Sequence, residues 1–328
     1  MLAVRIHETG GPEKLRTDEV SLPQPGPGEI RLRVEAAGIN FVDTYHRTGL
    51  YPSEMPHVLG SEAAGVVTAV GEGVTEFRVG DRVASPRAVG GYAEETLAPA
   101  SHTVLIPAAV SFQIAAAVLL QGLTAHYLAT DTYPLKPGDS ALVHAGAGGV
   151  GLLLIQIARI RGARVIATVG SDAKVGLARE AGAEQVCNYS RDDFSKAARA
   201  FTKAQGVDVA YDSVGKNTFE GTLDSLRPRG MFVSFGNASG PVPPFSPLVL
   251  AKKGSLFLTR PTLNHYIRTP AELRARTDEL FSWIASGRLK VRIGATFPLA
   301  AAGDAHRALE SRTTTGKLLL LPSGNRNP

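Results

Sequence analysis

Apolar positions along the chain change their spacing near residue 111. Before that point, short segments with alternating or β-branched apolar residues are bounded by Gly and Pro turns, which is typical of strands. Examples are Glu29–Glu35, Ala64–Val70 and Arg82–Ser85. This density of short strands predicts a small barrel or folded sheet in the first hundred residues.

From Ser111 onward, apolar positions follow helical spacing and alternate with short apolar runs. The pattern predicts a helix over Phe112–Leu128, followed by a repeated order of strand and helix. The expected strands and helices are Ala141–His144, Val150–Arg161, Arg164–Val169, Asp172–Ala181, Gln185–Asn188, Phe194–Lys203, Val207–Tyr211, Thr218–Leu226, Met231–Phe235 and Gly254–Arg260. Such alternation predicts the α/β class, with a doubly wound parallel sheet covered by helices. In the tail we expect a helix over Pro270–Ser286 and strands at Lys290–Ile293 and Lys317–Leu321.

Composition and charge narrow the class of protein. The 328 residues favour two domains, and 35 Lys and Arg against 30 Asp and Glu give a net charge of +5. These charges are scattered, which gives little support for nucleic-acid binding. The single cysteine, Cys187, excludes an internal disulfide framework and every multi-cysteine metal site. We see neither a secretory signal nor an uninterrupted apolar stretch that spans a bilayer, so we expect a cytoplasmic protein.

A glycine-rich turn follows the first strand of the alternating region. Its sequence is Gly146-Ala147-Gly148-Gly149-Val150-Gly151. The turn satisfies G-x-G-x-x-G in the strand–turn–helix context that the pattern requires. We expect Gly146 to permit the tight turn, Gly148 to let a pyrophosphate approach the backbone, and Gly151 to let the helix lie against the sheet. Gly149 and Val150 would present N–H groups to the anion at the helix start, so the turn predicts dinucleotide binding.

The end of the second strand favours NADP over NAD. An NAD site offers an acid about twenty residues after the glycines, to bond the ribose hydroxyls. Here the strand ends in Gly170 and Ser171, and Asp172 comes two residues late, where an acid in the first helical turn is commonplace. Ser171 can donate a hydroxyl and Lys174 can meet a 2′-phosphate with its charge. A solvated helix lysine remains the alternative for Lys174.

Several motifs resemble the medium-chain dehydrogenase/reductase superfamily, and within it the zinc-free, zeta-crystallin-like quinone oxidoreductases. The match is to the bacterial NADPH:quinone reductase branch and covers essentially the whole chain. The motifs that carry it are Gly38-Ile39-Asn40-Phe41-Val42-Asp43, Gly60-Ser61-Glu62-Ala63-Ala64-Gly65, His144 to Gly151, Tyr211-Asp212-Ser213-Val214-Gly215, Phe232 to Asn237 and Leu258-Thr259-Arg260-Pro261.

The resemblance implies a Rossmann-type nucleotide domain over residues 122–263. It also implies a β-rich, GroES-like catalytic domain made of residues 1–121 and 264–328. NADPH would bind in the cleft between the two domains. A homodimer is implied as well, with the segment Gly254–Pro261 as the edge strand that pairs across a twofold axis.

The resemblance also bears on metal binding. Zinc-dependent relatives have a cysteine where this chain has Asn40 and a histidine where it has Ser61. Zinc in proteins is held by thiolate, imidazole or carboxylate, so we expect no catalytic metal. Glu62, with Asp43 and His46 nearby in sequence, leaves a fortuitous site open, although a surface or packing role is favoured for His46. Without a Lewis acid, an acceptor that is already electrophilic is favoured, such as a quinone or an enone.

The resemblance implies that polar groups near the nicotinamide come from Asn40, Asp43, Tyr45 and Tyr51. In our hypothesis, Asn40 orients the carboxamide or the substrate oxygen, and Asp43 positions the surrounding network. Tyr45 or Tyr51 would donate a hydrogen bond to the developing anion, while an aromatic lining of the pocket is an equal alternative for both.

Further cofactor contacts are implied at four positions: Thr124, Tyr189, Phe235 and Gly236. Thr124 would help to hold the nicotinamide end, and Phe235 and Gly236 would flank the nicotinamide ribose. Tyr189 would share the 2′-phosphate with Lys174, or else be an ordinary aromatic residue at a strand end. Relatives often have arginine directly after this tyrosine, whereas this chain has Ser190-Arg191, so the polar partner there is open. Lys317 would either reach the cofactor or lie on the surface.

The sequence therefore predicts an NADPH:quinone oxidoreductase that transfers hydride without zinc. The nearest alternative is an enone or alkenal double-bond reductase that uses the same hydride. A third possibility from another class is a non-catalytic NADPH-binding relative with a structural or RNA-binding role, since the glycine turn does not require turnover.

Overall fold

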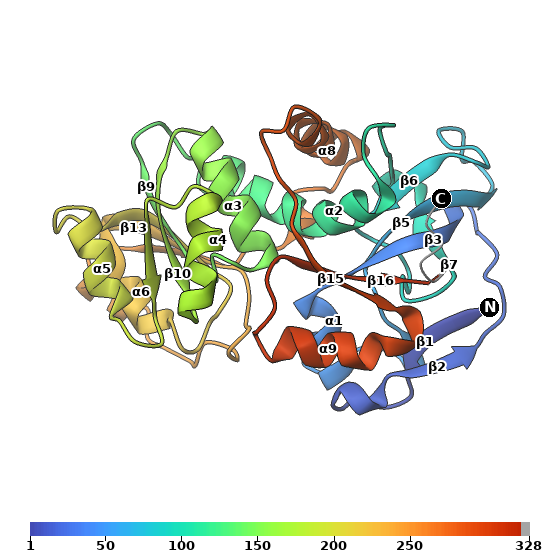
Figure 1. Cartoon of the computed structure of the whole chain (residues 1–328), viewed down its shortest axis with the longest axis horizontal. Coiled ribbons are helices and arrows are strands. Elements are labelled where there is room, and N and C mark those ends of the chain that lie inside the picture. Colours follow the sequence, from blue (N-terminus) through green and yellow to red (C-terminus); the bar gives the residue numbers. More distant parts are fainter. Residues whose placement is uncertain (323–328) are drawn as a thin grey trace. The chain divides into compact units, whose positions relative to one another are not determined.

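The computed structural model describes residues 1–322, which divide into two compact units (Figure 1). The first unit comprises residues 1–120, 267–287 and 291 onward. The second comprises residues 121–266 and 288–290. The first unit has two sheets and the second has one, and each unit has its own apolar core.

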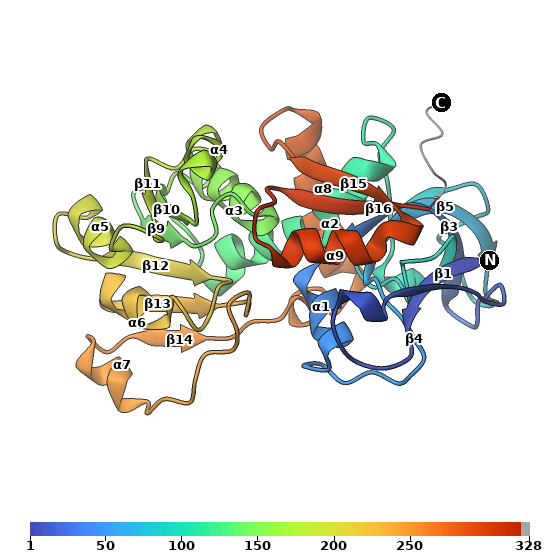
Figure 2. The same ribbon diagram turned by 60° about the horizontal axis from the view of Figure 1, so that its bottom comes forward.

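The second unit contains a six-stranded sheet in the order β11-β10-β9-β12-β13-β14, and every neighbouring pair is parallel. Its strands are β9 (Ser140–Val143), β10 (Arg164–Val169), β11 (Gln185–Asn188), β12 (Val207–Asp212), β13 (Leu226–Ser234) and β14 (Phe257–Thr259). Figure 2 shows β12, β13 and β14 side by side, with β14 at the edge. The prediction of a doubly wound parallel sheet is confirmed.

Helices cover both faces of this sheet. Helix α3 contacts α4, and α5 contacts α6, so each pair forms one layer. The helices are α3 (Gly149–Ile160), α4 (Val175–Glu180), α5 (Phe194–Phe201), α6 (Phe219–Ser225) and α7 (Leu248–Lys252). Because both faces are covered, Leu142, Ile166 and Ala210 on the central strands are fully buried, which explains the near-continuous apolar runs in the sequence.

The first unit is β-rich. A three-stranded sheet has the order β2-β1-β4, and a seven-stranded sheet has the order β15-β16-β3-β5-β6-β8, with β7 paired to β3. The strands are β1 (Leu2–Ile6), β2 (Arg16–Glu19), β3 (Glu29–Ile39), β4 (His57–Val58), β5 (Glu62–Val70), β6 (Arg82–Ser85), β7 (Glu95–Pro99), β8 (Val104–Leu105), β15 (Ile293–Pro298) and β16 (Lys317–Leu321). This is the β-rich unit that the short, turn-bounded segments predict.

Two helices of the first unit were not expected from the sequence: α1 (Phe41–Thr48) and α9 (Ala302–Glu310). Helix α8 (Pro270–Ala285) lies where it was predicted, behind a capping box in which Thr269 and Glu272 bond each other's backbone N–H. The predicted strand at Lys290–Ile293 is wrong, because β15 begins only at Ile293. It is fixed there by parallel pairing with the distant β16, which the local pattern cannot reveal.

Helix α2 (Phe112–Tyr127) continues as a π-helical turn over Leu128–Thr132. Within residues 1–322, this 21-residue stretch is the one helix long and apolar enough to cross a membrane by length and composition. However, 72% of its apolar window is buried inside the protein, as in the core helix of a globular domain. Short 3-10 turns complete the structure at Pro12–Lys14, Ala100–His102, Asp172–Lys174, Leu263–His265 and Leu299–Ala301.

Candidate active site

The glycine-rich turn joins β9 to α3 in the second unit. Gly146 N donates to Thr168 O at 2.8 Å, which ties the turn to the end of β10. Gly148 N donates to Ala145 O at 2.8 Å, and α3 begins one residue later at Gly149. The first N–H groups of a helix have no partner within it, so this end of α3 can bind an anion.

The turn needs glycine because there is no room for a Cβ atom, and not because its glycines adopt a left-handed conformation. The positive φ of +50° falls on Ala145 and not on Gly146. A Cβ atom at Gly146 would lie 2.8 Å from Ala167 Cβ, and one at Gly151 would lie 2.2 Å from Ala145 O. Gly148 is less crowded, with 3.1 Å between an added Cβ and Ala145 O. The turn therefore has the close-packed form that a dinucleotide pyrophosphate requires.

A buried polar network supports the strand ends beneath this turn. His144 bonds Thr168 Oγ1 and Thr222 Oγ1, each at 3.0 Å, and thereby links β9, β10 and α6. Burial lowers the pKa of His144, so the ring stays neutral and one nitrogen donates while the other accepts. The buried carboxylate of Asp212 accepts from the N–H groups of Val214 and Gly215. These contacts fix the carboxyl ends of the strands, where ligands bind in such sheets.

The ends of β10 and β11 bring together the residues expected at the 2′-phosphate. Val169 pairs with Asn188, so Gly170 and Tyr189 follow at the same edge of the sheet. A Cβ at Gly170 would lie 3.1 Å from the Tyr189 hydroxyl, which shows how closely the two loops approach. Ser171 precedes the 3-10 turn that ends in Lys174. Lys174 is half-buried, and burial lowers its pKa, so it is not a freely solvated lysine.

The remaining expected cofactor contacts lie directly after β13 and on α2. Phe235 follows β13, is partly exposed, and its N–H donates to Asp212 O at 2.8 Å. A Cβ at Gly236 would lie 2.6 Å from Ser213 O, so the chain passes close to the neighbouring strand end. Thr124 lies on α2 and is 8% exposed.

In the first unit, Asn40 and Asp43 cap the start of α1. Asn40 N donates to Asp43 Oδ2 at 2.8 Å, and the Asn40 side chain accepts from the Asp43 N–H, which forms a reciprocal capping box. Asn40 is 4% exposed and Asp43 is 1% exposed. The two side chains predicted to carry chemistry are thus buried and occupied by contacts within their own unit.

A buried ion pair lies beside this cap. Lys317 Nζ donates to Glu62 Oε2 at 2.6 Å and to Asn40 Oδ1 at 2.7 Å. Asn40 Nδ2 donates to Glu62 Oε2 at 3.0 Å, and Leu120 N donates to Glu62 Oε1 at 2.5 Å. Lys317 is 1% exposed and Glu62 is 0% exposed, so a surface position for Lys317 is wrong. Every charge in the cluster has a partner, as burial demands.

The carboxylate of Asp43 continues the network toward α9. Tyr92 Oη donates to Asp43 Oδ2 at 2.9 Å and lies 3.1 Å from His306 Nε2. Burial raises the pKa of Asp43 to about 6, against the opposing effect of the hydrogen bonds from Asn40 N and Tyr92 Oη. Burial and the nearby Arg47 lower the pKa of His306 to about 3, so this imidazole stays neutral.

The raised pKa of Asp43 predicts a specific pH dependence of stability. A carboxyl group that holds its proton more tightly in the folded state destabilises the fold as the pH rises from about 4 to about 6. Relative to Asp43→Asn, the wild type should lose at most about 3 kcal/mol over this interval. His306 titrates in both proteins and cancels in the comparison. Urea unfolding followed by the fluorescence of Trp283, the single tryptophan and a residue of the first unit, measures the free energy of unfolding of both proteins at pH 4 and at pH 6. If the difference in free energy between wild type and Asp43→Asn is the same at the two pH values, the prediction is refuted.

Tyr45 on α1 and Tyr51, which follows the end of this helix, are both more exposed than Asn40 and Asp43. Tyr51 N donates to Tyr45 O at 3.0 Å, and the two rings meet edge to face with centroids 5.3 Å apart. Tyr51 is 37% exposed and Tyr45 is partly exposed. His46 packs against Tyr51 and bonds Ser53 Oγ at 2.8 Å, which is the packing role favoured for it. α1 and the segment that follows it thus place two tyrosines side by side, whose hydroxyl groups can donate to an acceptor.

The donor set around Asn40 does not fit a zinc ion. The Asn40 amide oxygen accepts from the Lys317 ammonium, and both oxygens of Glu62 accept hydrogen bonds. Ser61 Oγ is directed to Asp43 Oδ1 at 3.5 Å. A second cation beside Lys317 would be repelled, and neither an amide nor a hydroxyl is among the usual zinc ligands. Among residues 1–322, no group of three or more His, Cys, Asp or Glu is placed to hold a metal.

From the sequence we expected no functional role for Tyr92 or His306, and we considered Glu62 only as a possible metal ligand. Tyr92 is 49 residues from Asp43 and 214 residues from His306 along the chain, so no local spacing in the sequence indicates these contacts. The one local signal available was the Asn40 and Asp43 spacing, which is that of a helix cap.

Comparison with known proteins assigns both units. Residues 26–108 match the family described as alcohol dehydrogenase GroES-like domain, and residues 149–285 match the family described as zinc-binding dehydrogenase. The two together define a medium-chain dehydrogenase/reductase. The zinc in the second family's description is not matched by the donor set around Asn40.

Relatives over the full length narrow the class. A quinone oxidoreductase of Pseudomonas aeruginosa is 47% identical over 95% of this chain and 97% of its own length. The structure of Escherichia coli quinone oxidoreductase complexed with NADPH has a TM-score of 0.96 and 46% identity, over 98% of this chain and 100% of that one. A 2-haloacrylate reductase of Burkholderia sp. is 43% identical over 98% of this chain and 99% of its own length. The chain belongs to the quinone oxidoreductase family, as its motifs predict.

Proposed function

We propose that the protein is an NADPH-dependent quinone oxidoreductase that transfers hydride without a zinc ion. The observation that carries the proposal is the close-packed glycine turn at the start of α3, with the half-buried Lys174 in the 3-10 turn that follows the neighbouring strand β10. A pyrophosphate and a 2′-phosphate are the anions that such a pair would bind. The activity, the enzyme class and the cofactor agree with those of the full-length relatives.

Bound NADPH would supply the hydride, and the chain would bind and orient it. In the second unit we assign the pyrophosphate to the turn from Gly146 to Gly151 and the 2′-phosphate to Ser171, Lys174 and Tyr189. Thr124, Phe235 and Gly236 are assigned to the nicotinamide end. We retain residues 122–263 as the nucleotide domain, and residues 1–121 and 264–328 as the catalytic domain.

In the first unit, Tyr45 and Tyr51 are assigned as hydrogen-bond donors to the acceptor oxygen that gains negative charge. We assign Asn40 and Asp43 to a positioning role, because both are buried and both hold the start of α1. Water can supply the proton, since a reduced quinone oxygen needs no obligate acid. The compartment we propose is the cytoplasm, on the low cysteine content.

The assignment of Lys174 predicts a selective loss of NADPH affinity. Lys174→Ala should weaken NADPH binding about tenfold to a hundredfold, because one charge-assisted contact to the 2′-phosphate is removed. NADH binding should stay within about twofold of wild type, since NADH lacks that phosphate. Fluorescence titration with both nucleotides measures the effect, with Lys196→Ala on the exposed face of α5 as the control. Equal losses for both nucleotides would remove Lys174 from the phosphate site.

A second candidate, reduction of an activated double bond, is favoured by the full-length likeness to 2-haloacrylate reductase. The same hydride would then be added to a carbon conjugated to a carbonyl group. Parallel assays with benzoquinones, alkenals and haloacrylates separate the two candidates by kcat/KM. NADPH binding without oxidation across this panel would instead favour the non-catalytic role.

We also propose a homodimer formed through the edge strand β14. Three apolar side chains are exposed on this strand and on the segment before it: Phe245 at 39%, Leu248 at 68% and Phe257 at 57%. Exposed apolar sheet edges are normally covered. Phe257→Asp should weaken dimerisation by at least about thirtyfold, as loss of a central interface side chain does. Light scattering measures it, with the equally exposed Val79→Asp as the control; a monomeric wild type would contradict the proposal.

A further inference from the structure

The loops after β10 and β11 contain an acid where an NADPH site should avoid one. Asp172 follows Ser171 by one residue and precedes Lys174 by two, so it lies within the segment assigned to the 2′-phosphate. A carboxylate there can accept hydrogen bonds from the ribose hydroxyls of NADH and repels a 2′-phosphate. Something must therefore neutralise Asp172 if the proposed cofactor is correct.

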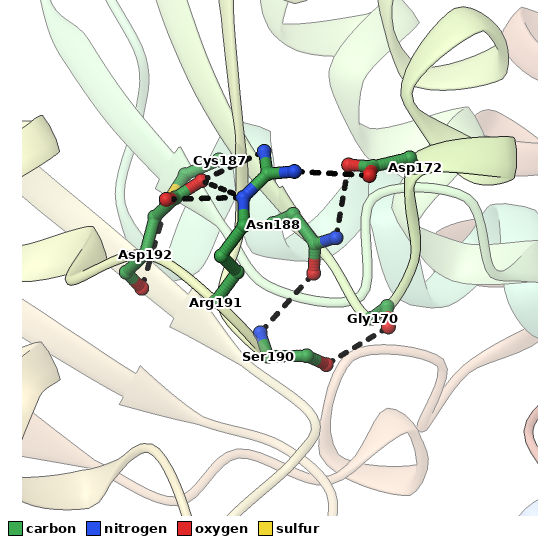
Figure 3. A network of polar contacts seen from close by, with 7 residues as sticks. All are labelled: Gly170, Asp172, Cys187, Asn188, Ser190, Arg191 and Asp192. Carbon is green, nitrogen blue, oxygen red and sulfur yellow. Dashed lines mark hydrogen bonds and ion pairs between the residues drawn. The ribbon is translucent and has the colours of Figure 1, made fainter.

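Both oxygens of Asp172 are held by side chains from the β11 loop (Figure 3). Asn188 Nδ2 donates to Asp172 Oδ1 at 3.0 Å, and Arg191 Nη1 pairs with Asp172 Oδ2 at 3.0 Å. The positive charge of Arg191 offsets the negative charge of Asp172 at this distance. The two contacts hold the carboxylate of Asp172 against the loop that follows β11.

The side chains that hold Asp172 are themselves fixed. Asn188 is 7% exposed, and its Oδ1 accepts from Ser190 N at 3.1 Å. Ser190 Oγ donates to Gly170 O at 2.9 Å, which ties the two loops together. Arg191 also pairs with Asp192 Oδ2 at 3.2 Å through Nη2, so its guanidinium bridges two acids. Figure 3 shows this bridge and the Asn188 contact converging on Asp172 from one side.

From this geometry we infer that Arg191 is a specificity-determining residue for NADPH over NADH, which acts by neutralising and holding Asp172. The inference rests on the proposed function and deepens it. Arg191 is not placed on the phosphate itself; Lys174 has that role, and Arg191 removes the repulsion that would oppose it.

The pair is too exposed to matter for the stability of the fold. The side chains of Arg191 and Asp172 are 63% and 64% exposed, and exposed ion pairs contribute little to folding. A charge close to a bound phosphate acts on binding even in a water-like dielectric. Removal of Arg191 should therefore change nucleotide selectivity and leave the fold intact.

The test is nucleotide binding to Arg191→Ala, by fluorescence titration with NADPH, NADH and adenosine 2′,5′-bisphosphate. We expect NADPH and the bisphosphate to bind roughly fivefold to tenfold more weakly, because the freed Asp172 repels the 2′-phosphate. NADH should bind as tightly as before or more tightly. Arg274→Ala, which breaks a half-exposed ion pair with Glu76 in the first unit, is the control and should change neither affinity.

The double variant Asp172→Ala/Arg191→Ala identifies the route of the effect. If Arg191 acts through Asp172, the double variant should bind NADPH within about twofold of Asp172→Ala alone. If Arg191 contacts the phosphate directly, its removal will weaken NADPH to the same extent without Asp172, and the inference is overturned. If the wild type binds NADPH tightly and Arg191→Ala binds it with the same affinity, the inference is also overturned. A wild type that binds no nucleotide overturns the proposed function instead.

Discussion

Lys317→Met should lower the free energy of unfolding of the first unit by about 3–5 kcal/mol. The substitution removes the ammonium and leaves the Glu62 carboxylate buried without its cation. Glu62 is 0% exposed, so water cannot replace the lost partner without rearrangement. The amide of Asn40 loses the donor to its Oδ1 at the same time. Urea unfolding followed by the fluorescence of Trp283, in α8 of the same unit, measures the loss.

Two further variants separate a lost charge pair from lost packing. Glu62→Gln added to Lys317→Met should recover part of the loss, because a neutral amide costs less to bury unpaired than a carboxylate does. Lys196→Met makes the same change at a side chain that is 86% exposed and should leave the urea midpoint unchanged. If the double variant were less stable than Lys317→Met alone, the charge pair would not be what holds this cluster.

Gly151→Ala should abolish tight NADPH binding, with affinity lowered by at least about a hundredfold. A Cβ at this position would lie 2.2 Å from Ala145 O, so the backbone of the turn must move. Movement of the turn misplaces the N–H groups that face the pyrophosphate, and loss of two such contacts to a charged group costs about 3 kcal/mol. Titration with NADPH, with far-ultraviolet circular dichroism to check the fold, measures the effect.

Two other glycines keep this prediction testable if Gly151→Ala fails to fold. Gly148→Ala has a mild contact of 3.1 Å to Ala145 O, so the variant should fold yet place a methyl group against the pyrophosphate. Gly176→Ala in α4 has no atom within 4 Å of the added Cβ and should stabilise the protein by about 0.5–1 kcal/mol with unchanged NADPH binding. Normal NADPH affinity in Gly148→Ala and Gly151→Ala would place the dinucleotide elsewhere.

The sequence could predict those features of the structure that depend on residues close together in the chain. The strand–helix alternation and the glycine turn are local patterns, and the structure has both where they were expected. Helix α1 also had a local signal, because the spacing of Asn40 and Asp43 is that of a helix cap, but the motif was interpreted only for its chemistry. The left-handed residue of the turn, Ala145, had no signal, since alanine seldom adopts a positive φ.

Long-range contacts account for the rest. Lys317 and Glu62 are 255 residues apart, and only the fold of the β-rich unit brings them together. The strand β15 is fixed by pairing with β16, so the apolar pattern of residues 290–293 misled the prediction. Asp172 was correctly assigned to the first helical turn, whereas its contacts with Asn188 and Arg191 depend on the pairing of two strands.

The most direct test of the central claim is anaerobic stopped-flow oxidation of NADPH by 1,4-benzoquinone, with protein that has been treated with a metal chelator. We predict that one NADPH is consumed for each quinone reduced, that the rate is unaffected by the chelator, and that NADH at the same concentration is oxidised more slowly. Protein that binds NADPH but oxidises none of it with any quinone, or that loses its rate with the metal, would contradict a zinc-independent NADPH:quinone oxidoreductase.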